Sequence, residues 1–282
     1  MLLGGCSCAW GIMRALAGGS QGLGVCPHSC CRFSTSLVGR ILACPLVSGP
    51  LRLNLWTMRV PVTPQKVGKL HRLVGRYAAR SLRRFPWRKR TSPYRVLIAE
   101  LMLQRTGAAQ VTPVFERFVN RFPGLVAAAQ AKPTALAKVL FPLGRTDRHR
   151  VFRKAFQYIA ANHNGRVPNR LDQLLKVPAV GPYTARAVLC FAYRQRVGLL
   201  DPNVYRLLQR VFGIVSAKKR FHTDAGLWHI VDGIAPRSGV RAFNWALLDI
   251  ASTLCVVREP HCRRCPLISV CKYGRNRLHG AA

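Results

Sequence analysis

Acidic residues are scarce in this chain, and long apolar runs are missing from it. The 282 residues include 45 Lys and Arg but only nine Asp and Glu, which gives a formal charge of +36. A chain this basic repels itself unless it meets polyanions, so nucleic acid is the first partner to consider. No apolar run reaches the roughly 18 to 20 residues of a membrane span, so we expect no membrane association. The apolar fraction of 49% also excludes a disordered basic tail.

The first 57 residues differ in composition from the rest. They contain no acid and no lysine and are rich in Gly, Ser, Cys and Leu. We favour a translated upstream stretch before a functional start at Met58, although the scattered arginines also fit an organellar transit peptide. In either case we expect residues 1–57 to be a poorly ordered extension. The protein would act in the cytoplasm at a bacterial or archaeal nucleoid, or in an organelle or nucleus if the extension is a transit peptide.

From Lys66 onward, apolar residues recur at helical spacing, and no stretch alternates with a period of two between turn signals. Seven cations lie between Arg76 and Arg90, and with no acid nearby we expect phosphate contacts there. Ser92 and Pro93 suit the N-cap and first position of a helix. We therefore predict an all-α fold. The predicted helices cover residues 66–84, 93–105, 108–121, 134–140, 147–162, 171–176, 182–194, 202–212, 224–234 and 242–253.

A Pro/Gly turn at residues 177–184 lies between two helical segments. Such a turn exposes backbone N–H groups at the start of the second helix, where they can bind a phosphate. The signal is weak alone, because most turns of this kind only reverse the chain. In a basic all-α chain it resembles the hairpin of helix-hairpin-helix DNA-binding proteins.

Two carboxylates stand in apolar surroundings. Glu100 lies in the helical run Val96–Leu103, where burial would raise the pKa of its carboxyl and suit it to general acid catalysis. A salt bridge to an arginine is the structural alternative. Asp201 follows Leu199 and Leu200 and precedes a proline, as a helix N-cap does. An ionised carboxylate there could instead stabilise an oxocarbenium-like sugar.

Four cysteines near the C-terminal end have the pattern C-x6-C-x2-C-x5-C. Four thiolates this close can hold one metal centre. Zinc is the common occupant of such sites, yet the six-residue first gap suits a larger [4Fe–4S] cluster better. The predicted ligands are Cys255, Cys262, Cys265 and Cys271.

Glu100, the hairpin, Asp201 and the cysteine pattern together resemble the endonuclease III branch of the helix-hairpin-helix DNA glycosylases. The resemblance covers about residues 66–273. It implies a six-helix barrel domain at 92–197, which contains the hairpin, and an iron–sulfur cluster domain formed by 58–91 plus 198–282. It also implies a monomer that binds double-stranded DNA with a mismatched or damaged base between the two domains.

The resemblance assigns roles to individual residues. Glu100 would activate water or move a proton, Asp201 would stabilise the sugar cation, and Asn203 would help orient the site. Tyr183 would line the base pocket, and Gln104 would fill the stack left by the flipped base. Further DNA contacts are implied for Arg105, Arg145, Val180, Gly181, Arg258 and Arg263. One departure is Ala179, which replaces the first glycine usual in the hairpin and puts full DNA affinity in question.

The residue before the hairpin threonine bears on the reaction. Tyr183 stands where strand-cutting relatives carry a lysine, so the resemblance implies a monofunctional hydrolase. A tyrosine there resembles thymine mismatch glycosylases and some adenine glycosylases. Adenine glycosylases tend to have a tyrosine pair where this chain has Arg145-Thr146, and a further domain after the cluster, whereas this chain ends 11 residues after Cys271. We expect removal of thymine or uracil opposite guanine, with an adenine glycosylase or a non-catalytic lesion binder as alternatives.

Overall fold

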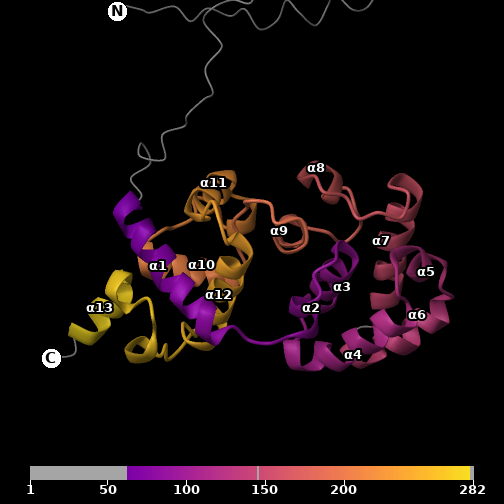
Figure 1. Ribbon diagram of the computed structural model, residues 1–282, viewed down its shortest axis with the longest axis horizontal. Helices are drawn as coiled ribbons and strands as arrows, with labels where there is room; N and C mark the ends of the chain where they lie inside the picture. Colours follow the sequence, from indigo (N-terminus) through magenta and orange to yellow (C-terminus); the bar gives the residue numbers. More distant parts are fainter. Residues whose placement is uncertain (1–61, 145, 280–282) are drawn as a thin grey trace, which may run out of the picture. The chain divides into compact units, whose positions relative to one another are not determined.

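The computed structural model describes residues 62–144 and 146–279 (Figure 1). The predictions for residues 1–57 and for Arg145 lie outside these ranges. All regular elements within the ranges are helices, which confirms the predicted all-α fold. None of the described helices combines the length and apolar character needed to cross a membrane.

One apolar core is built by the helices in the middle of the chain. It contains residues from Trp87 to Leu199 together with Ala235 and Val240 from later in the chain, and it includes four fully buried phenylalanines: Phe115, Phe118, Phe152 and Phe156. The helix α9 (Pro182–Phe191) is buried along eight consecutive residues and packs against α3 (Pro93–Leu103). The elements that contribute are α2 (Pro86–Lys89), α3 (Pro93–Leu103), α4 (Ala108–Arg121), α5 (Leu125–Gln130), α6 (Pro133–Leu140), η1 (Phe141–Leu143), α7 (Arg148–Asn162), α8 (Leu171–Leu174) and α9 (Pro182–Phe191).

A second apolar core joins the first helix to the C-terminal part of the chain. Leu70 and Val74 of α1 are fully buried in it, and α1 packs along α12. The chain passes from one core to the other between Leu199 and Leu200, directly before Asp201. The elements here are α1 (Pro64–Ser81), α10 (Pro202–Phe212), η2 (Phe221–Thr223), α11 (Ala225–Ile234), α12 (Val240–Thr253), η3 (Cys262–Arg264), η4 (Ile268–Val270) and α13 (Lys272–His279).

Most predicted helices are present, and their ends differ for identifiable reasons. The first ends at Ser81 rather than Arg84, because the extended backbone after it lets the Arg83 N–H donate to Asp249 at 3.0 Å. The helix predicted to reach Arg194 ends at Phe191, and Arg194 has a φ of 57°. The helices α2, α5 and α13 were not predicted. Ser92 does cap α3, with its hydroxyl accepting a hydrogen bond from the Arg95 N–H.

Candidate active site

Five of the predicted site residues line one cavity of about 340 Å³. Its walls come from the segment before α3, from α3 and α9, and from α10 and α12, so both apolar cores contribute. The sequence alone could place these side chains only on separate helices. The predicted residues in the lining are Glu100, Gln104, Tyr183, Asp201 and Asn203.

Glu100 is a buried carboxylic acid at this cavity. Its exposed fraction is 6%, and within the described residues it makes no ion pair. The alternative of a structural salt bridge is therefore not supported there. Burial, opposed by the charge of Arg88 and reinforced by that of Asp201, raises the pKa of the Glu100 carboxyl to about 8. Glu100 thus holds a proton at neutral pH, as a general acid requires.

Asp201 is the N-cap of α10 and also faces the cavity. Its carboxylate accepts hydrogen bonds from the Val204 N–H at 2.6 Å and from the Asn203 side chain at 3.1 Å. Asn203 is held in turn by Arg206, whose guanidinium donates to the Asn203 side-chain oxygen at 3.1 Å. The carboxylate is therefore fixed in position by its own helix, and its remaining surface is directed to the cavity.

Aromatic side chains enclose the cavity, and Tyr183 is one of them. Burial raises the pKa of the Tyr183 hydroxyl well above its usual value, so the side chain stays neutral. Phe85 and Trp87 stack at a centroid distance of 4.9 Å, and Phe191 and Trp245 stack at 5.3 Å. Flat apolar walls of this kind suit the faces of a planar aromatic ligand.

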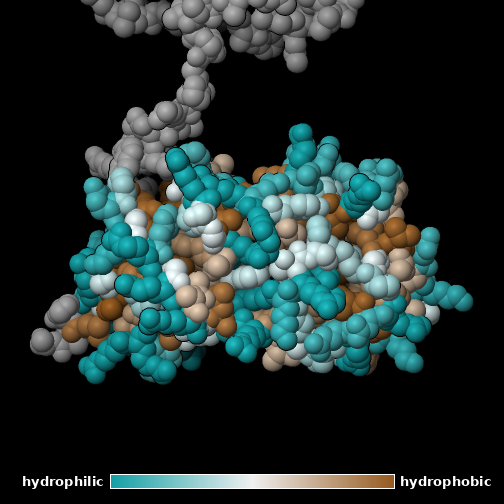
Figure 2. All heavy atoms as spheres, viewed as in Figure 1, coloured by the Kyte–Doolittle hydropathy of each residue, from teal (hydrophilic) through white to brown (hydrophobic). Residues whose placement is uncertain are grey.

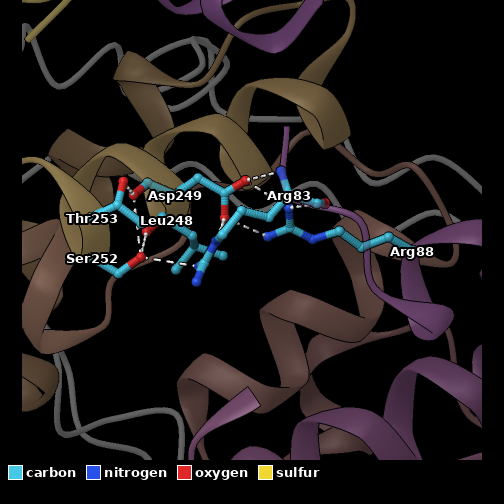
Figure 3. A network of polar contacts seen from close by, with 6 residues as sticks. All are labelled: Arg83, Arg88, Leu248, Asp249, Ser252 and Thr253. Carbon is cyan, nitrogen blue, oxygen red and sulfur yellow. Dashed lines mark hydrogen bonds and ion pairs between the residues drawn. The ribbon is translucent and has the colours of Figure 1, made fainter. Parts of the chain in front are cut away.

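A second carboxylate network supports one wall of the cavity (Figure 3). The fully buried Asp249 accepts two hydrogen bonds from the Arg88 guanidinium, at 2.7 and 3.0 Å, and one from Arg83 Nε at 2.7 Å. Burial would raise the pKa of Asp249, but the hydrogen bonds and charge of Arg88, together with the hydrogen bonds from Arg83, hold it below its ordinary value. Arg88 is thereby fixed beside the cavity, where its charge acts on Glu100 and Tyr183.

The hairpin at residues 177–184 leads into α9. The Val180 side chain is buried and its N–H donates to the Val177 carbonyl at 3.1 Å, so this N–H is used within the turn. Gly181 is exposed, caps no N–H with a side chain, and has open space around its Cα. Ala179 has a φ of 64°, in the left-handed region that glycine adopts without strain. The alanine therefore stands in a conformation that favours glycine.

The loop after α3 carries Gln104 and Arg105. Gln104 donates to the Ala179 carbonyl at 3.0 Å, which joins this loop to the hairpin, and Arg105 is exposed. The buried guanidinium of Arg148 donates to the Met102 carbonyl at 2.8 Å and to the Thr106 hydroxyl at 2.9 Å. It satisfies backbone groups at the end of α3 and holds the loop in place.

The four predicted thiols line one pocket. Cys255 Sγ lies 3.4 Å from the Arg210 guanidinium, and the Gly274 N–H donates to Cys271 Sγ at 3.3 Å. Among the described residues, no three His, Cys, Asp or Glu side chains are placed to hold a metal ion. The four thiols on one pocket, with an N–H donor and the Arg210 guanidinium beside them, nevertheless fit a thiolate-bound cluster by their chemistry. Arg258 and Arg263 are exposed in the same segment.

Comparison with known proteins gives the family. Residues 162–191, which include the hairpin, match the helix-hairpin-helix motif. A thymine-DNA glycosylase of Aeropyrum pernix is 36% identical over 208 residues, which are 73% of this chain and 93% of that protein. The chain belongs to the helix-hairpin-helix DNA glycosylases. An adenine DNA glycosylase of Mycobacterium tuberculosis is 38% identical over 194 residues, which are 67% of this chain but 62% of that enzyme.

Solved structures agree with this family. A thermostable thymine-DNA glycosylase superposes with a TM-score of 0.69 at 25% identity, covering 75% of this chain and 98% of that one. An endonuclease III–DNA complex superposes with a TM-score of 0.63 at 21% identity, covering 77% and 99%, and shows a common fold. The resemblance inferred from Glu100, the hairpin, Asp201 and the cysteines is thus confirmed at the level of the family.

Several residues that line this glycosylase's cavity, or support its wall as Asp249 does, were not predicted from the sequence. Asp249 shows the same signal that identified Glu100, because it is a lone acid between Leu248 and Ile250 in an apolar helix. Arg83 and Arg88 belong to a run of seven cations, and only their pairing with Asp249 distinguishes them from the rest. The remaining unpredicted lining includes Phe85, Trp87, Phe191, Trp245, Leu248 and Ser252.

Proposed function

We propose that this chain is a monofunctional base-excision DNA glycosylase that hydrolyses the N-glycosidic bond of thymine or uracil opposite guanine. The observation that carries the proposal is the convergence of Glu100 and Asp201 on one aromatic-walled cavity. Two carboxyl groups in unlike environments can divide acid and electrostatic work between them. Relatives named thymine-DNA or thymine/uracil-DNA glycosylase at 36% identity support this substrate class.

In this reaction the flipped base enters the cavity and its bond to the sugar C1′ breaks. The bonding electron pair leaves with the base, and the protonated Glu100 supplies the proton that neutralises it. Positive charge develops on the sugar, and the Asp201 carboxylate stabilises it. A water oxygen then bonds to C1′ and gives its proton back to Glu100. A base mispaired with guanine costs less to unstack, which contributes to selectivity.

The absence of a nucleophilic amine supports hydrolysis without strand cleavage. No lysine is among the described residues that line the cavity. Tyr183 stands at the position before the hairpin threonine, where strand-cutting relatives carry a lysine. Asn203 then has a positioning role, since it donates to Asp201 and is itself held by Arg206.

DNA would approach across the hairpin and the Gln104 loop. The Val180 N–H is already hydrogen-bonded within the turn. A DNA phosphate would therefore be bound by the free backbone N–H groups that begin at Gly181. Gln104 would fill the stack beside the guanine, and its bond to the Ala179 carbonyl keeps it near the hairpin. Contacts from Arg105, Arg145, Arg258 and Arg263 remain part of the proposal. We propose a monomer acting on duplex DNA, in two domains at 92–197 and at 58–91 plus 198–282.

Cys255, Cys262, Cys265 and Cys271 would hold a [4Fe–4S] cluster, which supplies a structural anchor for the C-terminal segment. Its influence would reach the site through α10, because Arg206 and Arg210 bind the backbone around Cys255 from the helix that Asp201 begins. The purified protein should be brown, with broad absorbance near ~400 nm and iron bound. Zinc at full occupancy with no iron would contradict the cluster.

An adenine glycosylase is the second candidate, favoured by the 38% identity to the Mycobacterium tuberculosis enzyme. A panel of labelled duplexes carrying T·G, U·G, A·G and A·8-oxoguanine pairs separates the two. Alkali added after incubation cleaves the strand at abasic sites. We expect cleaved strands from the T·G and U·G duplexes after alkali treatment. Without alkali, cleaved strands should appear only at trace levels. Excision of adenine alone would establish the second candidate, and no excision from any duplex would favour a non-catalytic lesion binder.

A further inference from the structure

The exposed side of α1 carries cations that the fold does not use. Lys69, Arg72, Arg76 and Arg80 are all exposed, and within residues 62–144 and 146–279 none of them forms an ion pair. Figure 2 shows hydrophilic side chains gathered over this helix. We call these four residues the α1 stripe. They follow one another at spacings of three or four residues, so they lie along one side of the helix.

Other cations of the same segment have internal partners, which sets the stripe apart. Lys66 donates to the Val211 carbonyl at 2.8 Å, and Arg83 pairs with Asp249. His71 contacts the Ile234 carbonyl at 2.7 Å. These inward contacts fix the orientation of α1, so the stripe is held outward.

The stripe works against the helix that carries it. Like charges four residues apart, as in Arg72, Arg76 and Arg80, destabilise a helix. No acid stands in the first turn of α1, and none occurs in the chain before Glu100. An anionic ligand along the stripe would remove this repulsion.

A groove of about 880 Å³ runs beside the stripe, between α1 and the connection from α11 to α12. Arg72 belongs to the α1 wall, and Arg196 and Arg237 stand on the other side. Small residues such as Gly75 and Ala79 form part of the lining, and no Asp or Glu is among the described residues there. The nearby carboxylate of Asp232 is already paired with Arg186. The groove therefore has cations on both walls and room for a backbone to approach.

The groove is separate from the catalytic cavity, since the two share no lining residue. α1 nevertheless ends two residues before Arg83, which lines the cavity. Its 18 residues span about 27 Å. A duplex rises about 3.4 Å per base pair along its axis, so the helix is as long as roughly eight base pairs of that axis.

We propose that the α1 stripe and the adjoining groove bind the phosphate backbone of nucleic acid, as a second contact surface in addition to the one that presents the target base. The proposal rests on the DNA-binding role proposed above. Charge complementarity identifies the occupant, because regularly spaced cations on an extended surface without acids match an extended polyanion. Such a surface contributes affinity without sequence preference and leaves the chemical step unchanged.

The test compares two triple variants of the full chain. Arg72→Gln with Arg76→Gln and Arg80→Gln removes three of the four charges of the stripe, and glutamine keeps a similar helix propensity. The control removes equal charge at exposed positions of α4 and α6, by Arg117→Gln with Arg121→Gln and Lys138→Gln. Binding to an undamaged 30-base-pair duplex is followed by fluorescence anisotropy across a salt series. Thermal unfolding confirms that both variants fold.

The stripe variant should bind about tenfold or more weakly near 0.1 M salt, and the slope of log K against log salt should fall by about 2 to 3. The control should lose no more than about threefold. Arg237→Glu, on the far wall of the groove, should weaken binding as well. Single-turnover excision at saturating enzyme should stay at the wild-type rate in every variant, because the cavity is untouched.

Equal losses in both triple variants would overturn the proposal, since they would reflect general attraction rather than a site. Unchanged binding of the stripe variant would overturn it too. So would a stripe that is required for binding anionic lipid vesicles of phosphatidylserine and phosphatidylcholine but not for binding DNA. A failure of the proposed base excision would leave the wild-type chain without product on every duplex, and the binding comparison would still be decided.

Discussion

The two helices α9 and α10 follow each other in the chain and begin almost alike. Each has proline at its first position, and each N-cap residue has extended backbone. They differ in the cap itself, because Gly181 offers no side chain whereas Asp201 accepts a hydrogen bond from the Val204 N–H. The start of α9 therefore leaves its N–H groups open to an anion, and the start of α10 presents an anion of its own.

This difference shows that one local structure, the start of a helix, can interact with either a negative or a positive group. An open helix N-terminus attracts a phosphate, while a carboxylate fixed at the same place can act on a developing cation. In the proposed reaction DNA supplies both, the phosphate in its backbone and the cation at the target sugar. Changing the two caps separately should therefore separate binding from chemistry.

The largest effect is expected from removing the charge at α10. Asp201→Asn preserves size and most capping ability, because asparagine is also a good N-cap. Single-turnover excision should fall by about a hundredfold or more, while binding to mismatched duplex persists. Melting temperature measured on the same preparation checks the fold.

Asp224→Asn is the matched control for that substitution. Asp224 caps α11 by accepting from the Leu227 N–H at 3.1 Å, and it does not line the cavity. It should lose at least as much stability without losing excision, because its carboxylate also accepts from the Ser216 hydroxyl and the Ala217 N–H. If Asp201→Asn stays within about tenfold of the wild-type rate, roughly 1.4 kcal/mol, Asp201 is a structural cap only.

The next effect concerns the acid that Asp201 influences. With the pKa of Glu100 at about 8, excision should decline about tenfold per pH unit above pH 8, as the protonated acid is lost. Stability should respond in the same range. Between the ordinary carboxyl pKa near 4.5 and about 8, the folded chain keeps a proton that the unfolded chain releases. The free energy of unfolding therefore falls as pH rises through that window.

Glu100→Gln tests the predicted pH dependence of stability. Glutamine cannot ionise, so the variant should lose the pH-dependent fall in stability and should be more stable than wild type at pH 8. Chemical denaturation at several pH values measures this. An excision rate that rises above pH 8 in the wild-type chain would mean that Glu100 acts only as a base.

Much of this site could be predicted because acids are so rare. Glu100 and Asp201 each conflict with apolar neighbours, and a conflict of that kind in a short list of carboxylates indicates function. Asp249 carries the same signal, yet its partners Arg83 and Arg88 lie more than 160 positions away in the chain. Sequence spacing cannot say which cations of a basic run turn inward. Tertiary packing decides that.

The positions of most helices could also be predicted from the sequence. Helical periodicity located most helices, since each long one buries an apolar face. The helices α2 and α5 were missed because four and six residues are too few to show a period. The helix α13 was missed because Tyr273 and Leu278 are its only large apolar residues. The ends of helices depended on distant contacts, as the Arg83 N–H donating to Asp249 shows.

A smaller effect is expected from making α9 resemble α10. Gly181→Asp places a carboxylate at the open N-terminus, where the φ of −89° and the free space allow any side chain. Duplex affinity should fall about tenfold through repulsion of the phosphate, and excision at saturating enzyme should remain near the wild-type rate. Gly124→Asp, at the similarly uncapped start of α5, is the control for added charge. Equal losses in both variants would argue against a phosphate site at the hairpin.

The smallest effect should come from Ala179→Gly in the same hairpin. An L-residue with a φ of 64° is strained by about 1–2 kcal/mol relative to glycine, and the greater freedom of glycine in the unfolded chain offsets part of that. We expect a net gain of about 0.5–1 kcal/mol and a melting temperature raised by about 1–4 °C. Duplex affinity should change less than about twofold, because the turn already has the left-handed shape and its carbonyl still accepts from Gln104. Asn164→Gly is the control, since asparagine tolerates its φ of 48° well and should gain only a few tenths of a kcal/mol. A loss of stability in Ala179→Gly would mean that contacts of the alanine side chain stabilise the fold by more than the backbone strain destabilises it. The turn before α9 would then not be a strained position.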